Sequence, residues 1–171
     1  HECLKASRSN DPVTNLAILF HDFGKATTRG AKPNGFSSYH GHEGAGVPIV
    51  EEIFRRLRFA KLGQNDKKNI LDAVAKHMLV HNLDKLNIKT LRKLIHSPSW
   101  EMIKEVGYAD EASRGPSHFN AQEFDAKIQR AEAKLGTIQG GAEELKKQIA
   151  AVVDGNKMIQ WFPQFQTDRK Q

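Results

Sequence analysis

Apolar residues recur along this chain at intervals of three and four residues, which is the spacing of one face of an α-helix. Two segments show the pattern most clearly, and their apolar positions are Val47, Val50, Ile53, Phe54 and Leu57 in the first and Ile70, Leu71, Val74 and Met78 in the second. We expect Pro48 in the first turn of the first helix or at a kink in it. Strand-like alternation occurs only once and briefly, so the pattern predicts an all-α fold.

Capping and stop signals add further helices. A helix running to Phe23 is expected to begin at "NDPV", with Asp11 as its N-cap and Pro12 in its first turn, and to stop at Gly24. Two more helices are expected over residues 87–97 and 98–115. Residues 29–41 contain three glycines and a proline, so we expect a loop there that borders the functional site.

The character of the chain changes after Pro116. Residues 119–135 and 142–153 are rich in Ala, Glu, Lys and Gln, and they flank the segment "GTIQGG". This arrangement predicts an antiparallel helical hairpin, followed by a tail too short to fold alone. We therefore expect two parts, a helical domain over residues 1–116 and a hairpin with its tail over residues 117–171.

Composition limits the compartment and the kind of site. The 171 residues contain no run approaching the roughly 18 apolar residues of a membrane span, and the chain does not begin like a signal peptide, so we expect a soluble, cytoplasmic protein. Cys3 is the single cysteine, which excludes an internal disulfide framework and any cysteine-based zinc site. Any metal is therefore expected on His, Asp or Glu. The net charge of +6 is compatible with a polyanionic partner such as RNA.

Histidines and aspartates supply the candidate chemistry. His77 and His81 are four residues apart and so share one helix face, which allows them to converge on one ion, although chance spacing explains the pair equally well. His40 and His42 lie just before a predicted helix, where unpaired backbone N–H groups also favour an anion such as phosphate. His21 and Asp22 are adjacent, and both side chains can reach one ion that lies between them.

Taken together, these residues resemble the pattern of the HD-domain family: a histidine, a His-Asp doublet about twenty residues later, further histidines and a distal aspartate. The segments "LAILFHDFGKATT", "YHGHEGAGVPIVEEIFRRLR", "VAKHMLVH" and "YADEASRG" are most similar to the HD domain attached to bacterial tRNA nucleotidyltransferases and poly(A) polymerases. The segment "VVDGNKMIQWF" resembles the sequence that follows that domain.

The resemblance implies a helical bundle that holds one or two divalent ions and hydrolyses phosphate esters, with a water activated by the metal. By position, the implied ligands of a first ion are His1, His21, Asp22 and Asp110, while His42, His77 and His81 are implied to bind a second ion or to contact the phosphate. His21, Asp22 and Lys25 are the implied catalytic residues, and Lys25, His40 and Arg114 are expected to contact phosphate or RNA. Lys25 is equally well explained as a lysine favoured by the dipole at a helix C-terminus.

Three functions follow as alternatives. The first is a metal-dependent phosphodiesterase or phosphatase acting on nucleotides, cyclic nucleotides or RNA ends, with Mn, Fe, Ni, Co, Zn or Mg as the ion. The second is the tRNA-binding body of a nucleotidyltransferase-like protein, for which the exposed cations would be Arg55, Arg56, Arg58, Lys61, Lys89, Arg92 and Lys93. The third is an HD fold that is retained only as structure, and the complete set of ligands argues against it.

Overall fold

The structure is a computed structural model that describes residues 2–33, 35–59 and 61–152. Its elements follow one another in the order α1 (Glu2–Ala6), α2 (Pro12–Phe20), η1 (Phe23–Ala26), β1 (Gly30–Ala31), β2 (Ser37–Ser38), α3 (His42–Leu57), α4 (Gln64–Val80), η2 (Leu83–Lys85), α5 (Ile88–Ile95), α6 (Trp100–Ala112) and α7 (Ala121–Val152). Apart from the two-stranded β1–β2 pair, the described fold is helical, which confirms the predicted all-α class.

The chain forms two compact units, His1–Ala131 and Glu132–Gln171. The first unit extends beyond the expected boundary at residue 116 because the start of α7 is buried within it. Phe124, Ile128 and Ala131 are each at most 5 % exposed. None of the helices in the described part of the chain combines the length and the apolar character that a membrane span requires.

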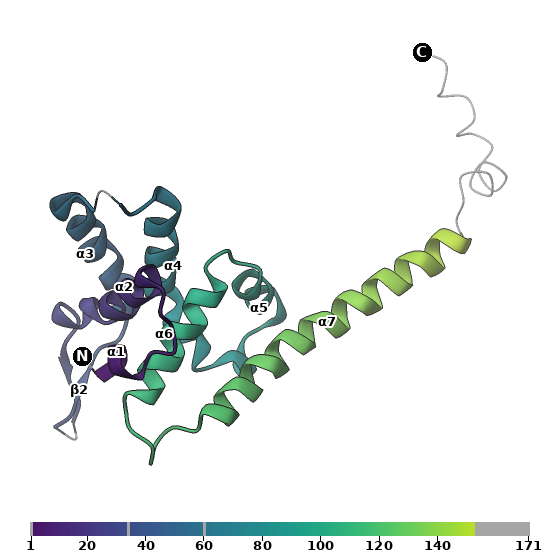
Figure 1. Cartoon of the computed structure of the whole chain (residues 1–171). Coiled ribbons are helices and arrows are strands. Elements are labelled where there is room, and N and C mark those ends of the chain that lie inside the picture. Colours follow the sequence, from purple (N-terminus) through teal and green to yellow (C-terminus); the bar gives the residue numbers. More distant parts are fainter. Residues whose placement is uncertain (1, 34, 60, 153–171) are drawn as a thin grey trace. The chain divides into compact units, whose positions relative to one another are not determined.

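The core of the first unit lies between α4 and α6, with α2, α3 and α1 packed around them (Figure 1). Ile70, Val74 and Val80 from α4 and Ile103 from α6 are all fully buried. The two helices approach closely at Gly107, where an added Cβ would lie 2.9 Å from a methyl group of Val80. Close packing of this kind gives rigid helices, and their ends carry the histidines and aspartates described below.

The predicted start of α2 agrees with the structure, whereas Pro48 and the segment 29–41 differ in detail from what was expected. Asp11 caps α2, accepting hydrogen bonds from the backbone N–H groups of Val13 and Thr14, and Pro12 occupies the first turn. Pro48 lies inside α3 rather than in its first turn, because α3 already begins at His42. The segment 29–41 contains the short antiparallel pair β1–β2, with Gly30 opposite Ser38. Its turn includes Gly35 at a φ of +80°, a conformation that glycine adopts without strain.

The predicted helical hairpin after Pro116 is wrong. Helix α7 continues from Ala121 to Val152 through the segment "GTIQGG" that was expected to turn. None of Gly136, Gly140 and Gly141 is among the described glycines with positive φ. A glycine inside a helix costs only about 1 kcal/mol relative to alanine, and the flanking Ala, Glu, Lys and Gln residues are strong helix formers. Without a proline, the three glycines therefore weaken the helix but do not end it. Residues 153–171, the predicted tail, lie outside the described residues.

Candidate metal centre

The His-Asp doublet lies where one helix ends and the next begins. His21 is the C-cap of α2, and Asp22 precedes the short helix η1. The doublet was expected inside a helix that runs to Phe23, but α2 ends at Phe20. The chain turns sharply here because Gly24 packs directly against the first turn of α3, where its missing side chain leaves room for the carbonyl of His42. This contact brings Asp22 and His42 together.

Four imidazole rings point their Nε2 atoms toward the two aspartates of the centre. His42 Nε2 lies 3.3 Å from Asp22 Oδ1, and His21 Nε2 lies 3.2 Å from Asp22 Oδ2 and 3.8 Å from Asp110 Oδ1. His81 Nε2 lies 3.0 Å from Asp110 Oδ2. The donor atoms of His21, Asp22 and His77 all lie within 4.8 Å of one another. The structure therefore brings together four segments, namely the α2–η1 junction, the start of α3, the end of α4 and α6.

The other ring nitrogen of each histidine is fixed by an acceptor. His21 Nδ1 lies 2.7 Å from the carbonyl of Ile18, and His77 Nδ1 lies 2.8 Å from the carbonyl of Val74. Likewise, His42 Nδ1 lies 2.8 Å from the carbonyl of Tyr39. A carbonyl can only accept, so Nδ1 must be the donor and a neutral ring leaves a lone pair on Nε2. Metal-binding histidines have this arrangement of one nitrogen held and the other free.

His81 follows the same rule with a side chain in place of a carbonyl. Its Nδ1 lies 2.9 Å from Glu111 Oε1, and Glu111 also accepts a hydrogen bond from Lys127 at 2.8 Å. The four-residue spacing of His77 and His81 allowed both rings to bind one ion. The two rings instead face different carboxylates, His77 near Asp22 and His81 near Asp110. The sequence offered no sign of Glu111, because a single carboxylate on a polar helix face has many ordinary explanations.

Buried nitrogen atoms without partners indicate that a cation belongs here. His21 is 3 % exposed, and its Nε2 and that of His81 are both buried. Each lies near a carboxylate oxygen, but in a direction that makes no hydrogen bond among the described residues. His42 Nε2 and His77 Nε2 face each other at 3.2 Å, although both rings already use Nδ1 as donor. Two lone pairs at that distance repel unless a proton or a metal ion lies between them. The residues present therefore fit a divalent cation.

The charges of the centre lead to the same conclusion. Burial disfavours a charge on His21, but Asp110 and Asp22 outweigh this effect and raise the pKa of His21 to about 10. For Asp22, burial is outweighed by His21 and Lys25, and its pKa falls to about 2. For His77, burial and the neighbouring rings of His21 and His42 outweigh Asp22, so its pKa falls to about 4 and the ring stays neutral. In the metal-free protein, a proton on His21 thus takes the place between the carboxylates that suits a metal ion.

Lys25, His40 and Arg114 were predicted to contact phosphate or RNA. Lys25 Nζ lies 2.6 Å from Asp22 Oδ2, so this lysine pairs with a carboxylate of the centre. Arg114 Nη2 lies 3.5 Å from Asp110 Oδ2, and its side chain is mostly exposed. His40 is exposed in the turn before α3 and lies apart from the buried cluster. The roles of all three remain predictions. The predicted ligand His1 lies outside the described residues.

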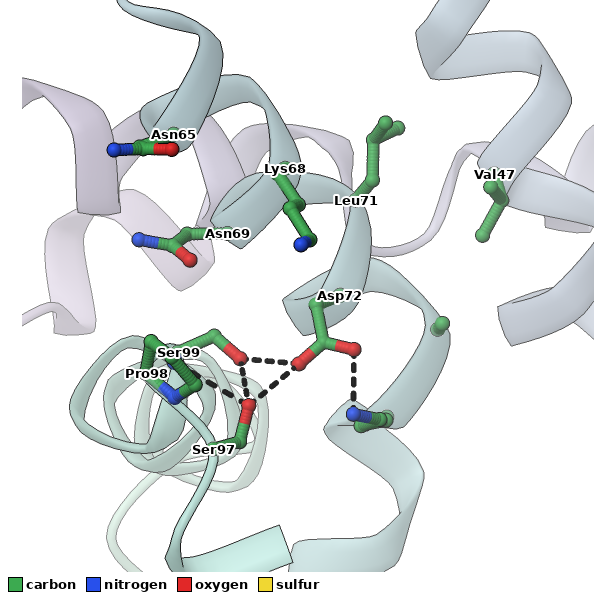
Figure 2. Close-up of a pocket in the computed structure, with 11 residues that line it drawn as sticks. Val47, Asn65, Lys68, Asn69, Leu71, Asp72, Ser97, Pro98 and Ser99 are labelled. Atoms are coloured by element: carbon green, nitrogen blue, oxygen red, sulfur yellow. Dashed lines mark hydrogen bonds and ion pairs between the residues drawn. The ribbon is translucent and has the colours of Figure 1, made fainter. Parts of the chain in front are cut away.

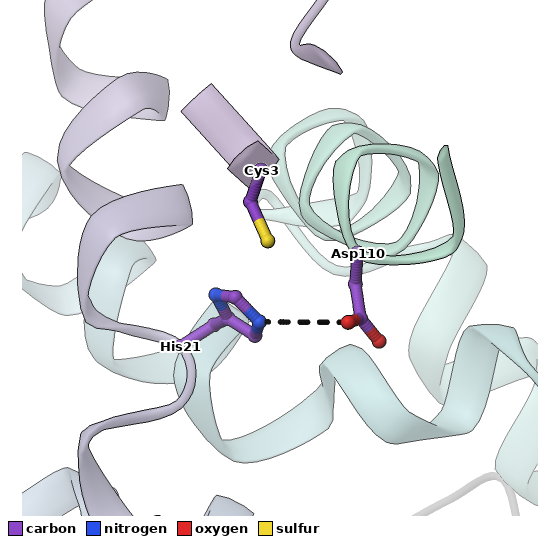
Figure 3. A group of neighbouring side chains, drawn as sticks. All are labelled: Cys3, His21 and Asp110. Carbon is purple, nitrogen blue, oxygen red and sulfur yellow. Dashed lines mark ion pairs between the residues drawn. The ribbon is translucent and has the colours of Figure 1, made fainter. Parts of the chain in front are cut away.

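Cys3 lies beside the centre, which the sequence did not predict. Its Sγ, His21 and Asp110 Oδ form a second group of donor atoms within 4.8 Å of one another, as Figure 3 shows. A cysteine-based site had been set aside because the chain holds only one cysteine. One thiolate is nevertheless enough for a site that mixes sulfur, nitrogen and oxygen ligands. The proximity of Cys3 to Asp110 could not be predicted, because no sequence spacing relates the two residues.

A separate cavity lies elsewhere in the first unit. It has a volume of about 700 Å³ and is lined by residues of α3, α4 and the α5–α6 connection, including Asp72, Lys76, Ser97 and Ser99 (Figure 2). Asp72 accepts hydrogen bonds from the hydroxyl groups of Ser97 and Ser99 and pairs with Lys76 at 2.5 Å. These polar groups satisfy one another, and they fasten the start of α6 to α4. This cavity contains none of the histidines.

The fold and the centre define a class, an all-α domain with a buried His/Asp centre suited to a divalent cation. The HD domain family matches residues 4–112, which is more than half of the chain. The chain therefore belongs to the HD-domain family, within the superfamily of metal-dependent phosphohydrolases. No solved structure matches the chain significantly.

Proposed function

We propose that this protein is a metal-dependent phosphohydrolase that acts on a phosphate monoester or diester, such as a nucleotide, a cyclic nucleotide or an RNA end. One observation carries the proposal: buried imidazoles with a fixed Nδ1 turn their Nε2 atoms toward two carboxylates, and two of these Nε2 atoms have no hydrogen-bond partner among residues 2–33, 35–59 and 61–152. His21, Asp22 and Asp110 would hold the first ion, with His42, His77 and His81 completing that site or holding a second ion.

A divalent ion held here would lower the pKa of a bound water and polarise a phosphoryl oxygen. The chain itself supplies the geometry and the balancing charges. Asp22 presents its two oxygens to two different imidazoles, those of His21 and His42. Lys25 and Arg114 place positive charge beside the two aspartates, where it would also attract an anionic substrate. Both side chains are partly exposed, so a phosphate arriving from solvent would meet both of them.

The test is a matched set of carboxamide variants in the full chain. Asp22→Asn and Asp110→Asn should abolish both stoichiometric metal binding and turnover in a screen of phosphate monoesters, diesters and cyclic nucleotides. Asp84→Asn makes the same chemical change at an exposed position and should leave both unchanged. Purified protein that binds no divalent metal, or variants at Asp22 and Asp110 that retain full turnover, would contradict the proposal.

A second candidate follows from the surface of α5. Leu91 and Leu94 of this helix are buried, whereas Lys89, Arg92 and Lys93 are exposed. An exposed cluster of cations suits an RNA backbone, as in the tRNA-binding body of a nucleotidyltransferase-like protein. The predicted contribution of Arg55 and Arg56 is weaker, because both pair with Glu52.

Salt dependence separates this candidate from the first. RNA affinity should fall steeply between low and moderate salt, and it should persist after the metal is removed by a chelator. Reversing Lys89 and Lys93 to Glu should weaken RNA binding without changing metal binding. RNA affinity that is absent, or that does not change with salt, would exclude the binding role.

A further inference from the structure

Helix α1 brings the only cysteine of the chain to the metal centre. Figure 3 shows the Cys3 side chain extending from α1 toward the ring of His21, with Asp110 of α6 on the other side. The donor atoms of these three residues all lie within 4.8 Å of one another. Cys3 is partly buried and forms no disulfide. Side chains from three separate segments thus bring a sulfur, a nitrogen and an oxygen atom into one region.

The ring of His21 places in this region a buried nitrogen that suits a metal ion. The ring is 3 % exposed, its Nδ1 is engaged by the carbonyl of Ile18, and its Nε2 has no hydrogen-bond partner in the described part of the chain. Asp110 Oδ1, at 3.8 Å from Nε2, is too distant for a hydrogen bond. The three donor atoms therefore face one another without bonding to one another. A buried nitrogen in this condition is costly unless a cation or a proton occupies the gap.

We propose that Cys3 is a thiolate ligand of the metal ion that His21 and Asp110 hold. The inference rests on the proposed function, because it requires the metal centre. When the sulfur–metal bond forms, the S–H bond of Cys3 breaks and its proton passes to solvent. A ligand set of sulfur, nitrogen and oxygen favours zinc, cobalt(II), iron(II) or nickel(II) over magnesium and calcium, which prefer oxygen alone. Cys3 thus determines which metals the centre accepts.

Cobalt(II) absorption tests the proposal without any assay of turnover. In the full chain, cobalt(II) bound to the centre should give weak ligand-field bands in the visible region. A thiolate ligand should add an intense sulfur-to-cobalt charge-transfer band in the near ultraviolet. Cys3 is the only cysteine, so this band has no other source. Cys3→Ser should keep the ligand-field bands, lose the charge-transfer band and weaken cobalt binding about tenfold, whereas Asp84→Asn should retain both bands.

The outcomes separate the two levels of the inference. Ligand-field bands without a charge-transfer band in the wild-type protein would overturn the role of Cys3 and leave the metal centre intact. Failure to bind cobalt(II), or any other divalent ion, would overturn the proposed function together with the role of Cys3. If Cys3→Ser does not fold, alkylation of the wild-type thiol decides: zinc should slow it about tenfold and magnesium should not, and equal rates with and without zinc would refute the proposal.

Discussion

Replacing Gly24 by alanine tests how the fold positions the His-Asp doublet. A Cβ at this residue of η1 would lie 2.0 Å from the carbonyl oxygen of His42 and 2.6 Å from the backbone nitrogen of Gly46. Both are backbone atoms of α3, so no side chain can rotate away. Ordinary contacts of a Cβ begin at 3.4 Å, so the distance must grow from 2.0 Å to 3.4 Å, and η1 and α3 must separate by about 1.4 Å.

This displacement should affect both stability and metal binding. Overpacking in a well-packed interior costs typically about 1–3 kcal/mol, and a clash with backbone belongs at the upper end of that range. Ligand distances in metal sites vary by only about 0.2 Å, far less than the separation that Gly24→Ala requires. Asp22 lies two residues before Gly24, and His42 carries the carbonyl that the new Cβ would meet. We therefore expect metal affinity to fall about 10- to 100-fold, as when the support of a ligand is lost.

Urea unfolding of the metal-free protein and competition with a metal-binding dye measure the two effects. Gly44→Ala is the matched control, because Gly44 also lies in this region, in α3, and an added Cβ would meet nothing within 4 Å. That variant should be stabilised by up to about 1 kcal/mol, since alanine favours the helix, and its metal affinity should not change. Gly24→Ala with wild-type stability and wild-type metal affinity would refute the claim that this contact positions Asp22.

Three further outcomes follow from the structure. Glu111→Gln should lower metal affinity about tenfold, because a neutral amide orients His81 less firmly than a carboxylate does. Glu101→Gln makes the same change at an exposed position and should leave metal affinity unchanged. Competition with a metal-binding dye measures the affinity of both variants. Folding raises the pKa of His21 from 6.5 to about 10, so the protonated ring stabilises the metal-free fold fully below pH 6.5, and this stabilisation is lost as the pH rises through 10. With a chelator present, the free energy of unfolding should therefore fall between pH 6.5 and 10. A constant free energy of unfolding over that range would contradict this prediction. Asp72→Asn should cost about 1–3 kcal/mol in urea unfolding while metal affinity stays unchanged, because Asp72 binds Ser97 and Ser99 outside the centre.

The helices with strong periodicity were predictable, and the weakly patterned segments were not. Helices α3, α4, α5 and α6 lie over the expected segments because each buries a stripe of apolar residues against the core. The five residues of α1 are too few for a periodic signal. In α7, the glycines of "GTIQGG" resembled a turn, but whether such a segment bends depends on whether closing the hairpin would bury enough apolar surface.

The sequence also predicted which residues would gather at the centre better than how they would be arranged. The approach of Asp110 to His21 could be expected from the order of the motif, and the structure places the two 3.8 Å apart. The division of His77 and His81 between two carboxylates could not be expected, because helical spacing gives only a shared face. Cys3 was missed for a different reason: its place beside Asp110 depends on the packing of α1 against α6.

A local hydrogen bond to the backbone orients most of the histidine rings of the centre. His21, His42 and His77 each direct Nδ1 to the backbone carbonyl three residues earlier in their own segment, those of Ile18, Tyr39 and Val74. Each ring is thereby oriented by its own backbone, and no other side chain has to be placed correctly first. His81 differs, because its Nδ1 is held by Glu111, and the position of Glu111 depends on the packing of α6.

The two ways of holding a ring have different consequences when the packing of α6 changes. Loosening α6 should release His81 and Asp110 together, while His21, His42 and His77 remain oriented, so the part of the centre around Asp22 should form even when the part around Asp110 does not.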